Sequence, residues 1–482
     1  MGLRILLALA GCAAEAAPAP AKPPPVILLS LDTLRADRLA AYGGTGDRMP
    51  NLDRFARESI VFETAITQAN ETLFSHASLL TSRYPSELGT IDYDFRIPPG
   101  TPTLQSVLGA YGWRTGAVVS GAFFSDAFGM DEGFGSFEVA KDWGSLWHAG
   151  PRALAWIDEA ERGDAPWMLL VHTYDMHARY LKPPPLGGLW SDPAYAGPAR
   201  NLLREAMGTE RVVDGAVMEA PPGVSPLDMM ANGVRRHVDG AWRYRTSPEA
   251  RRARELDAAD LAEVRAAYDG AAAYLDTLLG LFFAQLERRG VLDEAVVIVF
   301  SDHGEELGER GVFNHRWGLS EEVVRVPLMI RLPGGRGGGA RVPGIAELTD
   351  VTPTVLTLAG ATLPAVARGR PLLDAAGTVV PPTREVAYTE ASCRAVSARA
   401  TDGLLVFSGL GPDSPWLTEE LAAAPLDGPW FEGASLAPER KDALRRWIVD
   451  ARKALPPTPP PVGTGDARMK EALKERGYWE AR

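Results

Sequence analysis

The sequence has little cysteine, fewer positive than negative charges and no internal repeats. The first two features each argue against a class of protein. Only two of the 482 residues are cysteines, Cys12 and Cys393, so we expect no disulfide framework and a fold held by its core. The net charge of −12 argues against nucleic acid as a partner. With 46% hydrophobic residues, the chain suits one large α/β domain and a smaller one.

The N-terminal residues carry a targeting pattern. Arg4 precedes a short apolar run that ends in the letters LAGC at Cys12 and resembles the lipobox of bacterial lipoproteins. The run is too short to span a bilayer. An ordinary secretory signal with a chance cysteine is the alternative. We expect residues 1–24 to be a signal and an Ala/Pro-rich tether, with lipidated Cys12 anchoring the protein to a bacterial cell envelope outside the cytoplasm.

One continuous apolar run, which we expect to be a parallel strand, and a second run interrupted only by Ser30 predict two buried strands. Residues 26–31 read VILLSL and lead into Asp32, whereas residues 296–300 read VVIVF and lead into Asp302 and His303. Open α/β sheets bind ligands at the carboxyl ends of their strands. Adjacent Asp and His offer a hard and a borderline ligand to one metal ion. For either segment alone, a surface turn or a helix cap is the alternative.

A third segment, residues 71–85, places hydroxyl side chains before an Ala/Leu-rich helix that stops at Pro85. The N-terminus of a helix presents free N–H groups and the positive end of the helix dipole, which favour an anion. A hydroxyl there suits a nucleophile. N-capping by Thr72 or Ser75 is the alternative interpretation.

In combination these motifs resemble the sulfatase family of the alkaline phosphatase superfamily. The likeness covers about residues 26–370, and the following segments carry it in the family's order: DTLRAD (32–37), SHASLLT (75–81), the stretch around HTYDMHARY (172–180), SDHGE (301–305) and RVPL (325–328).

The resemblance implies an αβα sandwich with a mostly parallel central sheet and a small C-terminal α+β subdomain. The catalytic domain would span residues 25–370 and the C-terminal subdomain with a terminal helix residues 371–482, where 386–389 and 404–407 are strand candidates. Residues 183–257 would be an insertion. Its basic and aromatic side chains predict either a lid that attracts anionic substrate or a solvated helix face.

One departure from the family concerns the nucleophile. Sulfatases carry Cys-x-Pro-x-Arg, or Ser in place of Cys, and oxidise the first residue to formylglycine. Here Thr72 stands at that position, and Phe74 and His76 replace the Pro and Arg. Threonine cannot become formylglycine. Superfamily relatives that handle phosphate diesters do use a threonine nucleophile, and the same role is implied for Thr72.

A second departure concerns the metal. Thr33 stands where many sulfatases have the second Asp of a pair. The resemblance therefore implies a single divalent ion bound by Asp32, Thr72, Asp302 and His303. Three hard oxygens and one imidazole suit Ca²⁺, which we favour, or else Mn²⁺ or Zn²⁺.

Five of the seven histidines fall inside the matched motifs: His76, His172, His177, His303 and His315. A lone histidine is usually structural, but several at separate strand ends indicate a site. A leaving-group oxygen needs a proton or positive charge, which imidazole can supply near neutral pH. We favour His177 or His315 as this acid, with His76 and His172 as further catalytic candidates that stabilise the anion's oxygens.

The leading hypothesis is a metal-dependent hydrolase of sulfate or phosphate esters with Thr72 as nucleophile. Its substrate would be a small anionic ester or a sulfated or phosphorylated glycan or lipid. Two alternatives stay open: phosphoryl transfer to an acceptor in the cell envelope, and a degenerate sulfatase fold that only binds. Retention of Asp32, Asp302 and His303 argues against degeneration.

Overall fold

The computed structural model describes most of residues 22–456. The described residues are 22–89, 95–121, 123–140, 144–177, 180, 182–199, 256–309, 313–315, 319–391, 395–407, 430–432 and 437–456, with four short strands between 211 and 245. Cys12, Cys393 and most of the 183–257 region lie outside the described residues. The lipidation site, the lid and the terminal helix after residue 456 therefore stay predictions.

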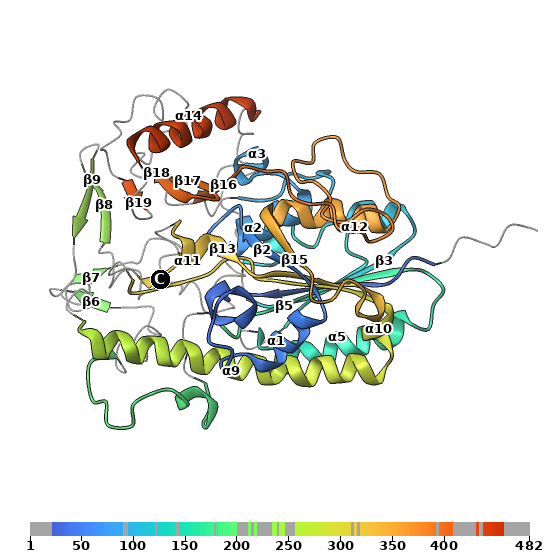
Figure 1. Cartoon of the computed structure of the whole chain (residues 1–482), viewed down its shortest axis with the longest axis horizontal. Coiled ribbons are helices and arrows are strands. Elements are labelled where there is room, and N and C mark those ends of the chain that lie inside the picture. Colours follow the sequence, from blue (N-terminus) through green and yellow to red (C-terminus); the bar gives the residue numbers. More distant parts are fainter. Residues whose placement is uncertain are drawn as a thin grey trace, which may run out of the picture.

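Within the described residues, a nine-stranded sheet forms the centre of the molecule (Figure 1). Its strand order is β13-β2-β14-β10-β1-β5-β3-β4, and β15 also pairs with β2. The strands are β1 (Val26–Leu31), β2 (Ile60–Ile66), β3 (Arg114–Val119), β4 (Ser136–Val139), β5 (Trp167–Thr173), β10 (Val296–Phe300), β13 (Arg325–Val326), β14 (Leu328–Arg331) and β15 (Arg341–Glu347). Strands β10, β1, β5, β3 and β4 run parallel, which confirms the mostly parallel sheet.

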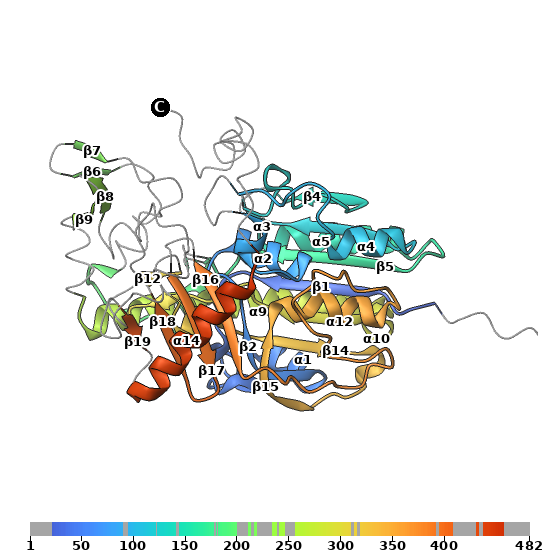
Figure 2. The ribbon, with the colours of Figure 1, turned by 90° about the horizontal axis from the view of Figure 1, so that it is seen from above.

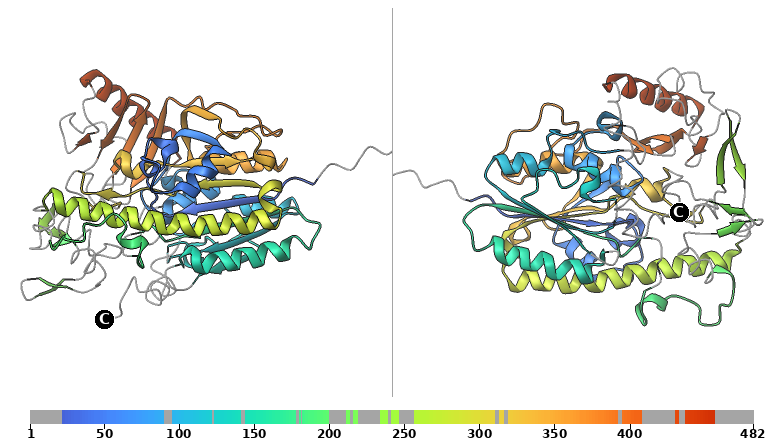
Figure 3. Two further views of the ribbon diagram at one scale, coloured as in Figure 1. Left: turned by 60° about the horizontal axis from the view of Figure 1, so that its bottom comes forward. Right: turned by 180° about the vertical axis from the view of Figure 1, so that it is seen from behind.

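Helices cover both faces of this sheet, as Figures 1 and 3 show. One face carries α1 (Pro50–Arg57), α5 (Leu146–Ala160) and α9 (Ala258–Arg288), and the other carries α2 (Thr72–Thr81), α4 (Leu104–Ala110) and α12 (Val351–Leu358). Alternate residues of β1 enter two separate cores: Ile27 and Leu29 pack on the α9 side, and Leu28 packs on the α2 side. The two cores confirm the αβα sandwich and explain why β1 is apolar at every position except Ser30.

The C-terminal subdomain is a small antiparallel sheet beside the main one (Figure 2). It comprises β16 (Val386–Ala391), β17 (Ala395–Ala400), β18 (Gly403–Phe407) and β19 (Trp430–Glu432), covered by α14 (Pro438–Ala454). Leu444 and Ile448 of α14 pack on Tyr388 and Val396 of the sheet. The sequence placed β16 and β18, but it did not indicate β17 or β19.

The remaining elements are short. They are α3 (Pro85–Leu88), α10 (Val291–Glu294), α11 (Glu321–Val324), the pair β11 (Glu306–Leu307) and β12 (Phe313–Asn314), and two hairpins, β6 (Arg211–Val213) with β7 (Ala216–Met218) and β8 (Val234–Val238) with β9 (Ala241–Arg245). None of the helices in the described part of the chain is long and apolar enough to cross a membrane.

Candidate active site

Two neighbouring strands bring the predicted ligands together. β1 and β10 are parallel neighbours with Ser30 opposite Phe300, so Asp32 and Asp302 leave the sheet at the same level. One ligand atom each from Asp32, Asp302 and His303 lies within 4.8 Å of the other two. All three side chains are fully buried. Asp32 and Asp302, which are 270 positions apart in the sequence, thus belong to a single cluster in the structure.

Thr72 is the first residue of α2, and its hydroxyl faces this cluster. Thr72 Oγ1 lies 3.4 Å from Asp32 Oδ2 and 3.4 Å from His303 Nε2. The residue before it, Glu71, occupies the N-cap position, and no side chain caps the helix. The hydroxyl of Thr72 is therefore directed at the acidic cluster and does not serve as an N-cap.

Backbone carbonyls fix the tautomers of two site histidines. The Nδ1 atom of His303 lies 3.0 Å from the carbonyl oxygen of Gly304, and Nδ1 of His172 lies 3.1 Å from that of Ser120. A carbonyl oxygen only accepts, so each Nδ1 carries a proton and each Nε2 is the nitrogen that faces the carboxylates. Metal-binding histidines are commonly held in this way through their second nitrogen.

The cluster consists of acceptors that face one another. Asp32 Oδ1, Asp302 Oδ2 and His172 Nε2 are buried and have no hydrogen-bond donor among the described residues. His172 Nε2 lies only 3.6 Å from Asp32 Oδ2. Burial, and secondarily the Asp302 carboxylate, raise the pKa of Asp32 well above its ordinary value. Because buried charges need a partner, this donor set fits a divalent cation.

His76 lies beside the cluster with both ring nitrogens engaged. Its Nδ1 donates to the carbonyl oxygen of Thr72 at 2.7 Å, and its Nε2 lies 2.9 Å from the hydroxyl of Ser30. Burial lowers the pKa of His76 to about 3. The distance between His76 Nδ1 and Asp302 Oδ2 is 3.7 Å, yet a protonated Nδ1 cannot bind a metal. The ring therefore holds the first turn of α2 and the backbone of Thr72.

The two candidate acids lie on the other side of His303. The ring centroid of His315 is 4.2 Å from that of His303 and 5.5 Å from that of His177. His177 is partly exposed and stacks on Tyr174 at 4.2 Å. Burial lowers the pKa of His315 well below its ordinary value, and for His172 it lowers the pKa to about 4.

Sequence reasoning missed the residues that orient Asp302. The backbone N–H groups of Thr33 and His303 donate to Asp302 Oδ1 at 3.3 and 3.0 Å, and Ser75 Oγ donates to the Asp302 carbonyl at 2.8 Å. Thr33 has φ of 55°, which is rare for a β-branched residue and typical of functional sites. Tyr268 of α9 supports this turn by donating to the Thr33 carbonyl at 2.7 Å. Ser75 and Tyr268 both lie in stretches that resemble the family, but no sequence pattern assigned this role to either residue.

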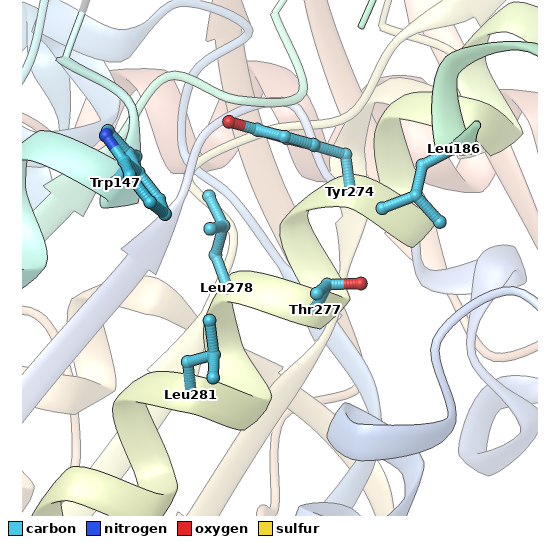
Figure 4. Close-up of a pocket in the computed structure, with 6 residues that line it drawn as sticks. All are labelled: Trp147, Leu186, Tyr274, Thr277, Leu278 and Leu281. Carbon is cyan, nitrogen blue, oxygen red and sulfur yellow. The ribbon is translucent and has the colours of Figure 1, made fainter. Parts of the chain in front are cut away.

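A separate cavity of about 300 Å³ opens on the outer surface between α5 and α9 (Figure 4). Its lining residues are Trp147, Leu186, Tyr274, Thr277, Leu278 and Leu281. These side chains supply no carboxylate, imidazole or cationic group. The cavity therefore lacks the features of an anion or metal site, and the buried cluster is the better candidate for chemistry.

Comparisons with known proteins bear on the family and the fold. The family model described as Sulfatase matches residues 24–361. The chain is 23% identical over 414 residues to N-acetylglucosamine-6-O-sulfatase of Bacteroides thetaiotaomicron, covering 76% of this chain and 74% of the relative. It is 30% identical over 422 residues to steryl-sulfatase of Mus musculus, covering 76% and 66%. The solved phosphonate monoester hydrolase of Agrobacterium radiobacter shares the fold, with a TM-score of 0.60, 19% identity and coverage of 80% and 87%.

Proposed function

Because the chain belongs to the sulfatase family, we propose that it hydrolyses sulfate or phosphate esters with Thr72 as the nucleophile. The observation that carries the proposal is the position of Thr72 Oγ1, 3.4 Å from both Asp32 Oδ2 and His303 Nε2. A buried hydroxyl at a helix N-terminus, aimed at a carboxylate and an imidazole, suits a nucleophile that shares its site with a metal ion.

Asp32, Asp302, His303 and Thr72 would hold one divalent cation. When bound, this ion would neutralise the two carboxylates, lower the pKa of the Thr72 hydroxyl and polarise the ester anion. The sequence favoured Ca²⁺, but the hydrogen bond of His303 Nδ1 turns the Nε2 nitrogen toward the carboxylates. Imidazole is a common ligand of Zn²⁺ and a rare one of Ca²⁺. We therefore propose Zn²⁺ or Mn²⁺ in preference to Ca²⁺.

The chemistry proceeds in two displacements. Thr72 Oγ1 passes its proton to Asp32 Oδ2, with which it is hydrogen-bonded. It attacks the sulfur or phosphorus atom and forms a new ester bond, while the bond to the leaving alcohol breaks and the leaving oxygen takes a proton. The positive end of α2 lies where charge develops on the anion. His177 and His315 are the candidate donors of that proton. His315 can donate it only from Nε2 of a protonated ring, because its Nδ1 is bonded to the Asn70 carbonyl and burial lowers the pKa of the ring. Water then cleaves the ester on Thr72 and restores the hydroxyl.

The substrate class and the location are further parts of the proposal. The names of two relatives, an N-acetylglucosamine-6-O-sulfatase and a steryl-sulfatase, support a sulfated sugar or a sulfated lipid as substrate. Lipidation of Cys12 would tether the enzyme to the cell envelope outside the cytoplasm. If so, Cys12→Ala releases the protein from the membrane fraction, and unchanged fractionation rejects the anchor.

The test is an activity screen of the purified protein after chelation and addition of single metal ions. Aryl sulfate, phosphate monoester, phosphodiester and phosphonate substrates should be compared. We expect turnover with at least one ester, dependent on added metal. A product transferred to an added acceptor alcohol would favour the phosphoryl transferase alternative. Absence of both turnover and bound metal would favour a degenerate binding protein and reject the proposal.

A further inference from the structure

Two hydrogen bonds join Asn70 and His315 in opposite directions. Asn70 Nδ2 donates to the carbonyl oxygen of His315 at 2.8 Å, and His315 Nδ1 donates to the carbonyl oxygen of Asn70 at 2.6 Å. Both residues are buried, with Asn70 fully inaccessible and His315 6% exposed. The first bond fixes the backbone that carries the ring, and the second fixes the tautomer and rotation of the ring.

The segment that contains Asn70 is held in turn by the C-terminal subdomain. Thr389 Oγ1 of β16 donates to the carbonyl oxygen of Thr67 at 2.7 Å, and the N–H of Glu390 donates to that of Gln68 at 3.0 Å. The views in Figures 1 and 2 place β16 near the start of α2. Residues 67–70 thus form a strap between a strand of the C-terminal subdomain and Thr72.

We infer that Asn70 is a positioning residue for His315, and that β16 steadies Asn70 through the strap. The inference rests on the proposed function, because it takes His315 as an imidazole that acts on the substrate. Its physical basis is the small tolerance of a catalytic group, since errors of about 0.5 Å are costly. Without the Asn70 amide, the His315 carbonyl loses its donor in a buried place and the loop that carries the ring must shift.

The experiment is a double-mutant cycle with Asn70→Ala, His315→Ala and the double variant. Each is assayed for kcat and KM with two esters, one releasing 4-nitrophenol and one releasing an aliphatic alcohol. We expect Asn70→Ala to lower kcat/KM about tenfold, the effect of one buried hydrogen bond. The loss should be greater for the alcohol, which needs protonation more. In the His315→Ala background, Asn70→Ala should cause no further loss.

Asn51→Ala is the matched control. Asn51 Nδ2 makes a partly buried hydrogen bond, to Asp276 Oδ2 at 2.8 Å, but it lies on α1 away from the site. It should lower the melting temperature without changing kcat/KM.

Thr389→Val provides a second arm of the experiment, because it removes the hydrogen bond from β16 to Thr67 while keeping the shape of the side chain. We expect a smaller loss than for Asn70→Ala, with the same dependence on the leaving group, and none when Asn70 is already alanine.

Each outcome decides between the inference and the function on which it rests. If His315→Ala is damaging and Asn70→Ala is neutral, the inference fails and the role of His315 stands. If the two losses multiply in the double variant, Asn70 acts independently of His315 and the inference also fails. If neither variant alters turnover while Thr72→Ala abolishes it, the role of His315 is rejected together with its positioning, but the nucleophile stands.

Discussion

Two clusters in the described part of the chain each bury a pair of carboxylates, and only one of the two contains an arginine that neutralises the pair. Beneath the C-terminal subdomain, Arg384 lies between Glu347 and Asp350, at 3.2 and 2.9 Å. Backbone donors complete this cluster: the N–H of Tyr388 donates to Glu347 and the N–H of Arg370 donates to Asp350. At the active site, Asp32 and Asp302 have no arginine or lysine partner among the described residues. Instead, His303 Nε2 lies 3.6 Å from Asp302 Oδ2, and His172 Nε2 lies 3.6 Å from Asp32 Oδ2.

The difference between the two clusters separates structure from function. A buried carboxylate pair with an arginine and full hydrogen bonding stabilises the protein as it stands. A buried pair surrounded by acceptors costs free energy until a cation arrives, and a fold keeps such a cost only where chemistry needs it. The Arg384 cluster is therefore a joint between subdomains, and the Asp32 cluster is a site. Four changes would test this distinction.

The largest effect is expected for Thr72→Ala, because it removes the atom that attacks the ester. We expect kcat to fall roughly a thousandfold or more, as for other catalytic nucleophiles. Folding should persist, since the hydroxyl does not cap α2. Steady-state assays and thermal melts would measure both quantities.

Ser78→Ala is the matched control for this change. Ser78 is buried on the same helix, and its hydroxyl makes no hydrogen bond within the described residues. It should keep full activity. Near-normal turnover by Thr72→Ala would remove Thr72 from the mechanism.

The next effect concerns the joint. Arg384→Met leaves Glu347 and Asp350 buried without a counter-charge, and breaking such a cluster costs about 3–5 kcal/mol in free energy of unfolding. Chemical denaturation would measure the loss. The exposed pair of Arg440 and Asp402 provides the comparison, because Arg440→Met should cost less than about 1 kcal/mol. Equal losses for the two variants would contradict the view that the Arg384 cluster holds the subdomains together.

The third effect is the stabilisation of the folded protein by a metal ion. It should depend on the active-site cluster and should not depend on the Arg384 cluster. A cation that binds only the folded protein, present at a hundred times its Kd, stabilises by about 2.7 kcal/mol. Melting curves with and without a chelator would show this shift, and elemental analysis would identify the ion. The shift should survive in Arg384→Met and vanish in Asp302→Asn. A chelator effect in both variants would place the metal elsewhere.

The sequence predicted the parts of the fold and of the candidate site that depend on local sequence pattern. Apolar runs predicted β1 and β10, and from the ends of these strands the cluster of Asp32, Asp302 and His303 could be placed. The identity of Thr72 as a nucleophile came from family resemblance and stays a prediction. Parallel strands carry a strong signal because both of their faces are buried.

Other parts depend on contacts that no local pattern encodes. The pairs Asn70–His315 and Thr389–Thr67 join residues 245 and 322 positions apart. The tautomers of His303 and His172 are set by carbonyl groups that only the fold brings near. Strand β17, which reads AVSARA, lacks a continuous apolar run, and its pairing with β16 and β18 was not visible in the sequence.

The smallest expected effect is the change in the free energy of unfolding when one aspartate of a cluster is replaced by asparagine. Its sign should differ between the two clusters. In metal-free protein, Asp32→Asn replaces a buried carboxyl group that lies against Asp302 and has no arginine or lysine partner within the described residues. We expect this variant to be more stable than the metal-free parent by about 1 kcal/mol, although it is inactive. Asp350→Asn removes a carboxylate that Arg384 needs, and it should destabilise the protein instead.

Denaturation in the presence of a chelator compares the two variants directly, with the parent as reference. The measurement is then repeated with the metal ion added. The parent should regain the lost stability, whereas Asp32→Asn should not. A destabilised metal-free Asp32→Asn would mean that the protein already satisfies Asp32 without a cation. In that case the acceptor cluster would resemble the joint, and its assignment as a metal site would fail.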